Sequence, residues 1–243
     1  MTTALIVQAR FNSTRLPGKV LLKIGTRSVL GNVLERCQAV AGIDAVCCCV
    51  PDGLENDPVA AEAIRSGSRV TRGPERDVLT RYLIAARELN ADPIMRVTSD
   101  CPLIDPFLCA EVLAFYRTTN GDIACNDLLP NWPHGLDCEV FSRAWLERAA
   151  REAVDPYDRE HVSTFIYRHP DARSWNLLGP GGSSARHRWT LDTAGDLAVI
   201  RAIATRLPDG PPGWRWTAAL AVVEADPALL SLSRQGDLRQ ASA

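Results

Sequence analysis

One loop near the N-terminus carries the side chains best suited to bind phosphate. The stretch 8–19 follows an apolar run, residues 4–7, that we interpret as a buried β-strand. It holds two arginines, two hydroxyl side chains, a glycine and a lysine, although only two of the chain's 27 basic residues are lysines. Backbone N–H groups, hydroxyls and cations at the end of a strand suit a polyphosphate. The loop therefore predicts a phosphate site, with a basic surface turn as the alternative.

The loop is not a Walker A motif, although it contains a Gly-Lys pair. That motif has a glycine six residues before its lysine and Ser or Thr directly after it. Here Ser13 and Val20 occupy these two places around Lys19.

Two aspartates offer a site for a cation next to that loop. Asp100 and Asp192 each follow an apolar run that we interpret as a strand. Mg²⁺ takes one or two protein carboxylates and completes its shell with water and substrate phosphates, and phosphoryl or nucleotidyl transfer needs that neutralisation of charge. The alternative is that both aspartates only cap strand ends.

Composition indicates one folded unit and excludes several classes of partner. The chain has 243 residues, 46% of them hydrophobic, and a net charge of −2. A balance so near neutrality does not indicate non-specific nucleic-acid binding, and no apolar run reaches the length of a membrane span. The sequence begins with Met-Thr-Thr and then a strand, without a signal peptide. We expect a soluble cytoplasmic protein with no membrane partner.

The eight cysteines are predicted to be reduced and buried. Cys47, Cys48 and Cys49 are consecutive in an apolar run, and alternate residues of a strand face opposite sides of a sheet. No C-x-x-C pair provides zinc-ligand spacing, and the four histidines are scattered. A disulfide framework or a zinc site is therefore not expected.

Apolar periodicity predicts alternating strands and helices. The expected strands are 4–7, 45–50, a short one at Val70, 93–97, 122–125, 138–141, 174–178 and 187–191. The expected helices are 28–41, 57–66, one carrying residues 79–89, and segments beginning at residues 105, 142, 155, 193 and 216, of which the last three extend to about 169, 207 and 234. The helix from residue 193 begins with Thr193-Ala194-Gly195-Asp196, which resembles a capping box with Asp in the Glu/Gln place, and the last segment restarts at Asp226-Pro227. Residues 235–243 are expected to fray.

This order of elements predicts an α/β fold whose sheet is parallel in its first half and covered by helices on both faces. We expect a single domain over 1–243, with a smaller lobe at about 121–175. Ligands of such sheets bind at the carboxyl ends of the strands. The loop after residue 7, Asp100 and Asp192 would all lie at that edge.

Several motifs resemble those of the cytidylyltransferase family, which includes CMP-sialic acid synthetases, CMP-KDO synthetases and the spore coat polysaccharide biosynthesis protein F group. The first is Q-A-R-x-x-S-T-R-L-P-G-K-V-L, beginning at Gln8. Others are G-x-x-x-D-V-L-x-R at 73–81, S-D-C-P at 99–102, H-G-L-D-C-E-V-F at 134–141, R-E-H-V at 159–162, and R-W-T-L-D-x-x-x-D-L at 188–197. His134 departs from the Asp found in many relatives, and Phe11-Asn12 from Met-Gly.

The resemblance implies a Rossmann-like nucleotide-diphospho-sugar transferase fold, GT-A-like, with a mixed sheet flanked by helices. It implies Mg²⁺-dependent transfer of CMP from CTP to an acidic sugar or related acceptor, with release of pyrophosphate, by an enzyme that can form a homodimer. The implied catalytic residues are Arg10, Lys19, Asp100 and Asp192, of which Asp100 and Asp192 would bind the metal. The implied nucleotide-binding residues are Gln8, Ala9, Arg10, Ser13, Arg15, Lys19, Arg76, Asp77 and Arg81. The implied acceptor-binding residues are His134, Asp137, Glu139, Glu160 and His161.

Other interpretations of these residues stay open. Asp77 could only stabilise the N-terminus of a helix through its interaction with the helix dipole, and His161 could be a structural histidine. A nucleotide-sugar-dependent glycosyltransferase is a second enzymatic hypothesis, although such enzymes usually carry a D-x-D metal motif and no such triplet occurs here. A catalytically silent nucleotide-binding module is a third hypothesis. The presence of both aspartates and Lys19 argues against it.

Overall fold

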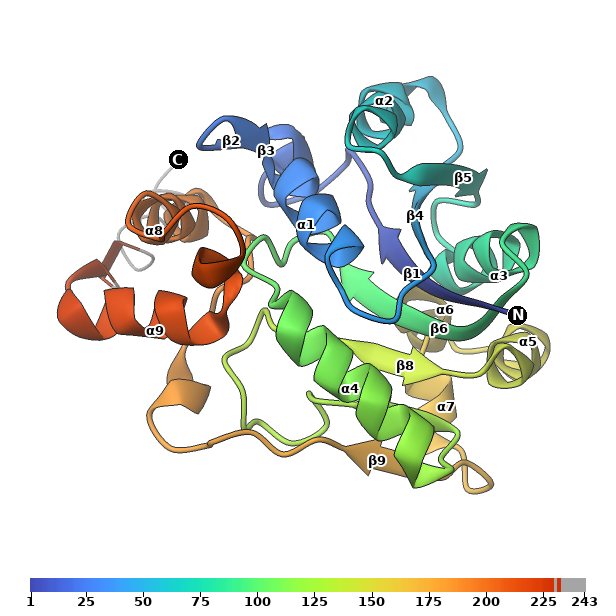
Figure 1. The fold of residues 1–243 in the computed structure, drawn as a ribbon. Coiled ribbons are helices and arrows are strands. Elements are labelled where there is room, and N and C mark those ends of the chain that lie inside the picture. Colours follow the sequence, from blue (N-terminus) through green and yellow to red (C-terminus); the bar gives the residue numbers. More distant parts are fainter. Residues whose placement is uncertain (230, 233–243) are drawn as a thin grey trace.

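The structure is a computed structural model that describes residues 1–229 and 231–232. Within these residues a seven-stranded sheet lies between two layers of helices, with strand order β5-β4-β1-β6-β8-β7-β9 (Figure 1). A separate short hairpin is formed by β2 (Lys23–Ile24) and β3 (Arg27–Ser28). The strands of the main sheet are β1 (Thr2–Gln8), β4 (Ala45–Pro51), β5 (Arg69–Gly73), β6 (Ala91–Thr98), β7 (Ile123–Cys125), β8 (Glu139–Phe141) and β9 (Ser174–Asn176).

Each face of the sheet has its own hydrophobic core. One face packs on α1 (Val29–Gln38), α2 (Asp57–Arg65), α4 (Pro106–Thr119), α8 (Ala194–Ala204) and α9 (Trp216–Ala225). The other face packs on α3 (Val78–Glu88), α5 (Arg143–Glu152) and α7 (Thr164–Arg168), and α6 (Pro156–His161) lies beside α3 and α7. Short 3₁₀ turns occur at Lys19–Leu21, Leu54–Asn56, Ser184–Arg186 and Pro211–Trp214. The predicted mixed sheet flanked by helices is confirmed.

The topology brings the ends of several strands to one edge of the sheet. β1 pairs in parallel with β4 on one side and with β6 on the other, so the chain changes direction across the sheet at β1. β8 runs antiparallel between β6 and β7, and β7 is therefore parallel to β6 again. The carboxyl ends of β1, β6 and β7 and the start of β8 thus share one edge. A crevice forms at such a change of direction, and ligands of open α/β sheets bind there.

The predicted strand at 187–191 is wrong, because this segment does not join the sheet. It is extended and makes one bridge, between His134 and Arg188. The Trp189 N–H donates to the carbonyl of His134 at 2.7 Å, and the Leu191 N–H donates to the carbonyl of Asp100 at 2.8 Å. Pairing with two loops replaces pairing with a strand. Asp192 consequently lies at the sheet edge without being a strand end.

The predicted single helix at 155–169 is also wrong. It is two helices, α6 and α7, separated by Val162, whose φ of 62° is left-handed and ends the first helix. Val162 is fully buried, and Ser163 beside it donates its hydroxyl to Glu139 at 2.7 Å. Packing and this hydrogen bond hold the break in place. In the segment predicted as helical over 216–234 with a restart at Asp226-Pro227, α9 ends at Ala225, and residues 229, 231 and 232 are helical again. The prediction that residues 235–243 fray lies outside the described residues.

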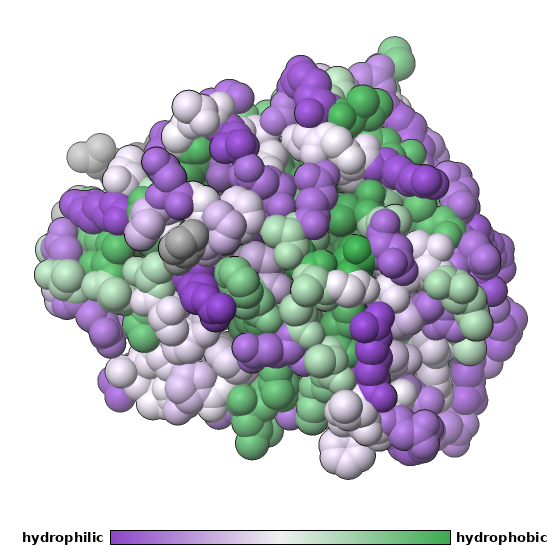
Figure 2. Space-filling view, in the orientation of Figure 1, coloured by the Kyte–Doolittle hydropathy of each residue, from purple (hydrophilic) through white to green (hydrophobic). Residues whose placement is uncertain are grey.

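No helix in the described part of the chain is long and apolar enough to cross a membrane. On the face drawn in Figure 2, hydrophobic and hydrophilic residues are interspersed. The predicted state of the cysteines is confirmed: all eight lie in the described ranges, are buried and form no disulfide. Cys48 belongs to one core and Cys47 and Cys49 to the other, as strand alternation requires.

Thiol titration tests this arrangement of cysteines. Burial raises the pKa of Cys47 to about 11 and of Cys49 to about 12, and a thiol that stays protonated reacts slowly. We expect all eight thiols to react with a disulfide reagent in denatured protein without reductant, and almost none in native protein at pH 8. Fewer than eight thiols in an anaerobic denatured sample, or rapid reaction of the native protein, would contradict the fold.

Candidate active site

The loop after β1 is folded back so that Lys19 points into the crevice. The Gly18 N–H donates to the carbonyl of Phe11 at 2.9 Å, and the Phe11 N–H donates to the side-chain oxygen of buried Asn56 at 3.0 Å. Gly18 has a φ of 68°, and a Cβ there would lie 3.2 Å from the Phe11 ring. Only glycine adopts this conformation without strain. Gly18 therefore closes the loop directly before Lys19.

Lys19 contacts both of the aspartates that the sequence singles out. Its Nζ lies 3.0 Å from Asp192 Oδ1 and 3.4 Å from Asp100 Oδ2, and it donates to the carbonyl of Leu191 at 2.6 Å. Burial raises the pKa of Asp100, but the Lys19 charge and a hydrogen bond from Thr98 more than offset it and leave the pKa below its ordinary value. Two carboxylates from distant parts of the sequence thus face one small cationic space.

A second network holds Asp192 in that position. Arg188 donates through Nη2 to Asp192 Oδ2 and through Nη1 to Asp196 Oδ1 at 2.7 Å. Asp196 Oδ2 accepts from the backbone N–H groups of Asp192 and Thr193, and Thr193 and Asp196 form the predicted capping box of α8. These bonds lower the pKa of Asp196 against the effect of burial. Arg15 Nη2 adds a third cation, 3.0 Å from Asp192 Oδ1.

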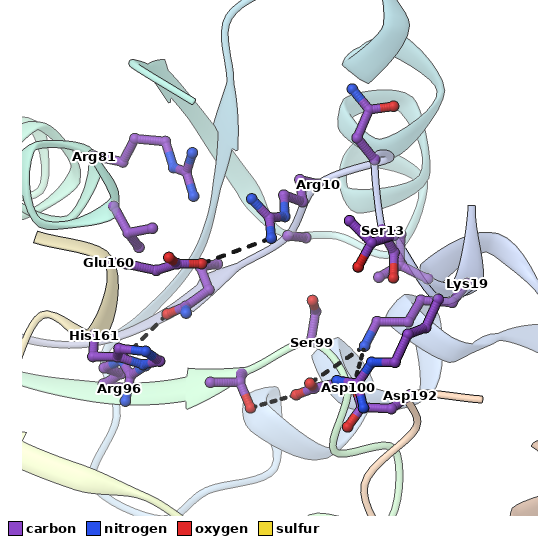
Figure 3. A pocket seen from close by; sticks show the side chains of 18 residues that line it. Arg10, Ser13, Lys19, Arg81, Arg96, Ser99, Asp100, Glu160, His161 and Asp192 are labelled. Carbon is purple, nitrogen blue, oxygen red and sulfur yellow. Dashed lines mark hydrogen bonds and ion pairs between the residues drawn. The ribbon is translucent and has the colours of Figure 1, made fainter. Parts of the chain in front are cut away.

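A cavity of about 330 Å³ extends from this cluster along the end of β1 (Figure 3). Arg10 and Glu160 lie opposite the Lys19 cluster, with Arg10 Nη2 3.7 Å from Glu160 Oε1. Ser13 and Ser99 supply hydroxyls between the two ends. Its charged and polar lining also includes Gln8, Asn12, Thr14, Arg15, Arg81, Arg96, Thr98 and His161.

An adjoining cavity of about 310 Å³ lies on the other side of Asp100 and Asp192. Like these two aspartates, Arg15, Arg96 and Thr98 line both cavities. The second cavity has further walls from the end of β6, from the loops around β7 and β8 and from the extended segment before Asp192. These wall residues are Val97, Cys101, Asp127, His134, Asp137, Glu139 and Thr190. The two aspartates therefore stand where two ligand-sized spaces meet.

Arg96 lines both cavities and connects their walls through hydrogen bonds. It is a charged residue within β6, and it donates to Glu139 Oε2 at 2.8 Å and to Gln8 Oε1 at 3.2 Å. Tyr82 donates to the same Gln8 oxygen at 2.8 Å. Burial lowers the pKa of Arg96, but Glu139 more than offsets this and the net pKa is raised. Gln8 and Glu139 are consequently held in fixed positions at neighbouring strand ends.

Most residues expected to bind nucleotide lie together, and two do not. Gln8, Ala9, Arg10, Ser13, Arg15, Lys19 and Arg81 line the first cavity. Asp77 instead caps α3, accepting from the Thr80 N–H at 2.9 Å and from Arg159 at 2.6 Å, and neither Arg76 nor Asp77 lines either cavity. Burial raises the pKa of Asp77, but the hydrogen bonds from Arg159 and Thr80 leave it lowered. The contacts of Asp77 are therefore those of a helix N-cap.

The residues expected to bind the acceptor are divided between the cavities. His134, Asp137 and Glu139 line the second cavity, whereas Glu160 and His161 line the first, beside Arg10. Burial lowers the pKa of His161, with Arg96 as the next cause, and keeps the ring neutral near pH 7.

Sequence reasoning missed several polar residues of the site. Arg96 carried a visible signal, because a lone arginine interrupts an otherwise apolar strand. Asp127 had none beyond residue type, since its position depends on how the loop after β7 folds. Arg188 and Thr190 lie in the motif at 188–197, from which only Asp192 was taken as a site residue.

The donor set suits a hard cation with few protein ligands. No group of three or more His, Cys, Asp or Glu side chains able to hold a metal occurs in the described ranges. Two carboxylates are nevertheless what Mg²⁺ takes when water and substrate phosphates fill the other positions. That Asp100 and Asp192 already share one cation, the Lys19 ammonium, shows that the space between them accepts positive charge.

Comparisons with known proteins agree with this geometry. A model of the cytidylyltransferase family matches residues 4–184. The spore coat polysaccharide biosynthesis protein SpsF of Bacillus subtilis is 31% identical over 213 residues, covering 85% of this chain and 88% of that protein. The solved structure of a cytidylyltransferase from Leptospira borgpetersenii is 27% identical, with a TM-score of 0.88 over 94% of this chain and 96% of that one. A CMP:2-keto-3-deoxy-manno-octonic acid synthetase complexed with CTP shares the fold at 18% identity, with a TM-score of 0.64 over 84% of this chain and 99% of that one.

Replacing the shared cation tests the cluster itself. Lys19→Met leaves Asp100 and Asp192 facing each other, and we expect it to lower the free energy of unfolding at pH 7 by about 1–2 kcal/mol, less than for a fully buried pair because the aspartates are partly exposed. The pKa of Asp100 is lower in the folded protein than in the unfolded chain. The ionised Asp100 therefore stabilises the fold above the ordinary carboxyl pKa of about 4, and this stabilisation is lost as the pH falls through the pKa of the folded state.

Urea unfolding of both proteins between pH 7 and pH 3 measures this effect. The difference between wild type and Lys19→Met should shrink as the solution becomes acidic. A difference that is absent at pH 7, or that grows in acid, would show that the ammonium does not stabilise the carboxylates.

Proposed function

The chain belongs to the cytidylyltransferase family, and on that premise we propose that it is a Mg²⁺-dependent enzyme that transfers CMP from CTP to a sugar acid and releases pyrophosphate. The observation that carries the proposal is the placement of Asp100 and Asp192, with Lys19, on the wall shared by two cavities. In a nucleotidyl transfer, positive charge must neutralise the phosphates of the nucleotide at the point where the acceptor attacks. That point lies between the nucleotide site and the acceptor site.

The first cavity has the donors that a nucleoside triphosphate requires. Arg10, Arg15 and Lys19 carry positive charge, and Ser13 adds a hydroxyl. Arginine presents a fork that matches phosphate oxygens. In this assignment the triphosphate lies along the loop after β1, with its α-phosphorus next to Asp100 and Asp192. The base would then lie toward Arg81, at the other end of the cavity.

The reaction forms one bond and breaks one. A hydroxyl oxygen of the acceptor, held in the second cavity, attacks the α-phosphorus of CTP. The bond from that phosphorus to the oxygen bridging to the β-phosphorus breaks, and pyrophosphate leaves with the electron pair. The hydroxyl proton passes to a base or to water. In this assignment the acceptor in the second cavity would approach the α-phosphorus from the side opposite the leaving pyrophosphate in the first, as in-line displacement requires.

Mg²⁺ would be held by Asp100 and Asp192. When bound, it supplies positive charge to the α-phosphate oxygens and to the leaving pyrophosphate. Lys19 contacts the same two carboxylates, and a phosphate oxygen entering this space would give its ammonium a new partner. Arg188 and Asp196 keep Asp192 in place throughout.

A sugar acid as acceptor is supported by the guanidinium groups in the second cavity. Arg15 and Arg96 line it, and each can donate to a carboxylate. The relative SpsF, named for spore coat polysaccharide biosynthesis, is consistent with an activated sugar as product. The glycosyltransferase alternative differs in needing a nucleotide sugar as donor, and a silent module would bind CTP without turnover.

A pyrophosphate-release screen separates these functions. Purified full-length protein with Mg²⁺ is given each of the four nucleoside triphosphates and a panel of sugar acids. We expect release only with CTP plus a sugar acid. Release with ATP or UTP at equal or greater rate would overturn the CTP assignment, and CTP binding in calorimetry without any release would favour a silent module.

Removing either carboxylate tests the proposed chemistry. Asp100→Asn and Asp192→Asn should each lower kcat/KM by roughly a hundredfold or more, the size of effect seen when one charge-stabilising group is removed. The double variant should be scarcely worse than either single one, because the two side chains act as a unit. The far-ultraviolet circular dichroism should stay unchanged.

Asp209→Asn is the matched control, since Asp209 is an exposed aspartate in the loop after α8 and lines neither of the two cavities. It should keep full activity. Full activity in Asp100→Asn or Asp192→Asn, or strictly additive losses in the double variant, would remove the carboxylate pair from the mechanism.

A further inference from the structure

Every carboxylate oxygen of the aspartate pair already has a donor. Lys19 Nζ lies 3.0 Å from Asp192 Oδ1 and 3.4 Å from Asp100 Oδ2, so one ammonium stands between the two side chains (Figure 3). The Thr98 hydroxyl donates to Asp100 Oδ1 at 2.6 Å, and Arg188 donates to Asp192 Oδ2. A metal ion that joins the two aspartates therefore enters a space in which the protein has placed a cation of its own.

Lys19 is the donor that a metal ion cannot leave in place. Mg²⁺ binds carboxylate oxygens at about 2.1 Å, so on Asp192 Oδ1 it would lie at most about 5 Å from an ammonium that stays 3.0 Å from the same oxygen. The side chains of Lys19 and Asp192 are only 13% and 17% exposed, and little water screens the repulsion between the two cations. Arg15 contacts the same oxygen at 3.0 Å, but its side chain is 61% exposed. Thr98 and Arg188 each contact one of the two carboxylates and do not stand between them.

A phosphate is the partner that would allow Lys19 to leave the aspartates. Its third contact is the carbonyl of Leu191 at 2.6 Å, and within residues 1–229 and 231–232 its Nζ reaches no carboxylate other than Asp100 and Asp192. An ammonium in a partly buried place is costly without an anion. Lys19 also lines the first cavity, to which we assign the triphosphate. A phosphate oxygen there would replace the carboxylates as its anionic partner.

We propose that Lys19 closes the metal site until the nucleotide binds: its ammonium competes with the metal ion for Asp100 and Asp192, and a phosphate of the nucleotide draws it away. The inference rests on the proposed function and adds to it an order of binding at the same site. Nucleotide and metal ion then raise each other's affinity by the same factor, as linkage between two ligands requires. Lys19 is the residue that couples them.

Binding of Mn²⁺ without nucleotide tests this competition directly. Free Mn²⁺ is measured by electron paramagnetic resonance during titration of the full chain at pH 7, so the readout does not depend on activity. Lys19→Met removes the ammonium and leaves both carboxylates. We expect it to bind Mn²⁺ at least roughly tenfold more tightly than wild type, the effect of removing one competing charged hydrogen bond. Mn²⁺ alone should also raise the Tm of Lys19→Met more than that of wild type.

Lys23→Met is the matched control, because Lys23 is the only other lysine of the chain. Its exposed ammonium donates to the carbonyl of Thr26 at 3.5 Å, and it lines neither of the two cavities. It should bind Mn²⁺ as weakly as wild type. Adding Asp192→Asn to Lys19→Met should abolish the gain in affinity, because the gain requires both carboxylates. Lys19→Gln is a second variant without the charge, for use if Lys19→Met does not fold.

Tight binding of Mn²⁺ by wild type without nucleotide, or folded Lys19 variants that bind it no better than wild type, would overturn the inference. In both cases pyrophosphate release with CTP and a sugar acid would leave the proposed function standing. A gain in affinity that survives Asp192→Asn would place the metal ion elsewhere and overturn the inference together with the proposed metal site. Absence of CTP-dependent release from wild type would overturn the proposed function, whereas the Mn²⁺ titrations would still decide whether Lys19 closes the site.

Discussion

The contact of one ammonium group with two carboxylates is the interaction on which the site depends. Lys19 reaches Asp192 Oδ1 at 3.0 Å and Asp100 Oδ2 at 3.4 Å, and these three residues come from three separate segments of the chain. The turn at Gly18 aims the lysine, the end of β6 provides the first aspartate, and the segment before α8 provides the second. Two like charges face one small space only when a cation joins them. Positive charge at this point is therefore a requirement of the fold as well as of nucleotidyl transfer.

The sheet explains why the cluster lies between two cavities. The chain changes direction across the sheet at β1, so a crevice opens between the carboxyl ends of β1 and β6. The antiparallel strand β8 then returns β7 to the same edge, and the second cavity extends along it to Asp127. Arg96 joins the two halves through Gln8 and Glu139. A single edge of one sheet thus holds the nucleotide side and the acceptor side of the proposed reaction.

Local sequence signals predicted the parts of this site that depend on local structure. The loop from Gln8 to Lys19, the capping box of α8 and the alternation of the three consecutive cysteines follow from residue type and spacing, and each is found. The segment before Asp192 was expected to be a strand, but it pairs with two loops instead. Its apolar residues suit a strand and an extended segment between loops equally well, so residue type could not distinguish the two. The break at Val162 and the position of Asp127 depend on contacts between segments that are distant in the sequence. Neither periodicity nor motif spacing reports such contacts.

The most direct test of the proposed site is a crystal structure of the protein with a non-hydrolysable CTP analogue and Mn²⁺, located by its anomalous scattering. We expect one strong anomalous peak between the carboxylates of Asp100 and Asp192, within about 2.5 Å of an oxygen of each as metal–carboxylate bonds require. The Lys19 ammonium should contact a phosphate oxygen. A metal bound elsewhere, or a triphosphate that lies away from the loop after β1 with Lys19 still on both aspartates, would contradict the proposed metal and nucleotide sites.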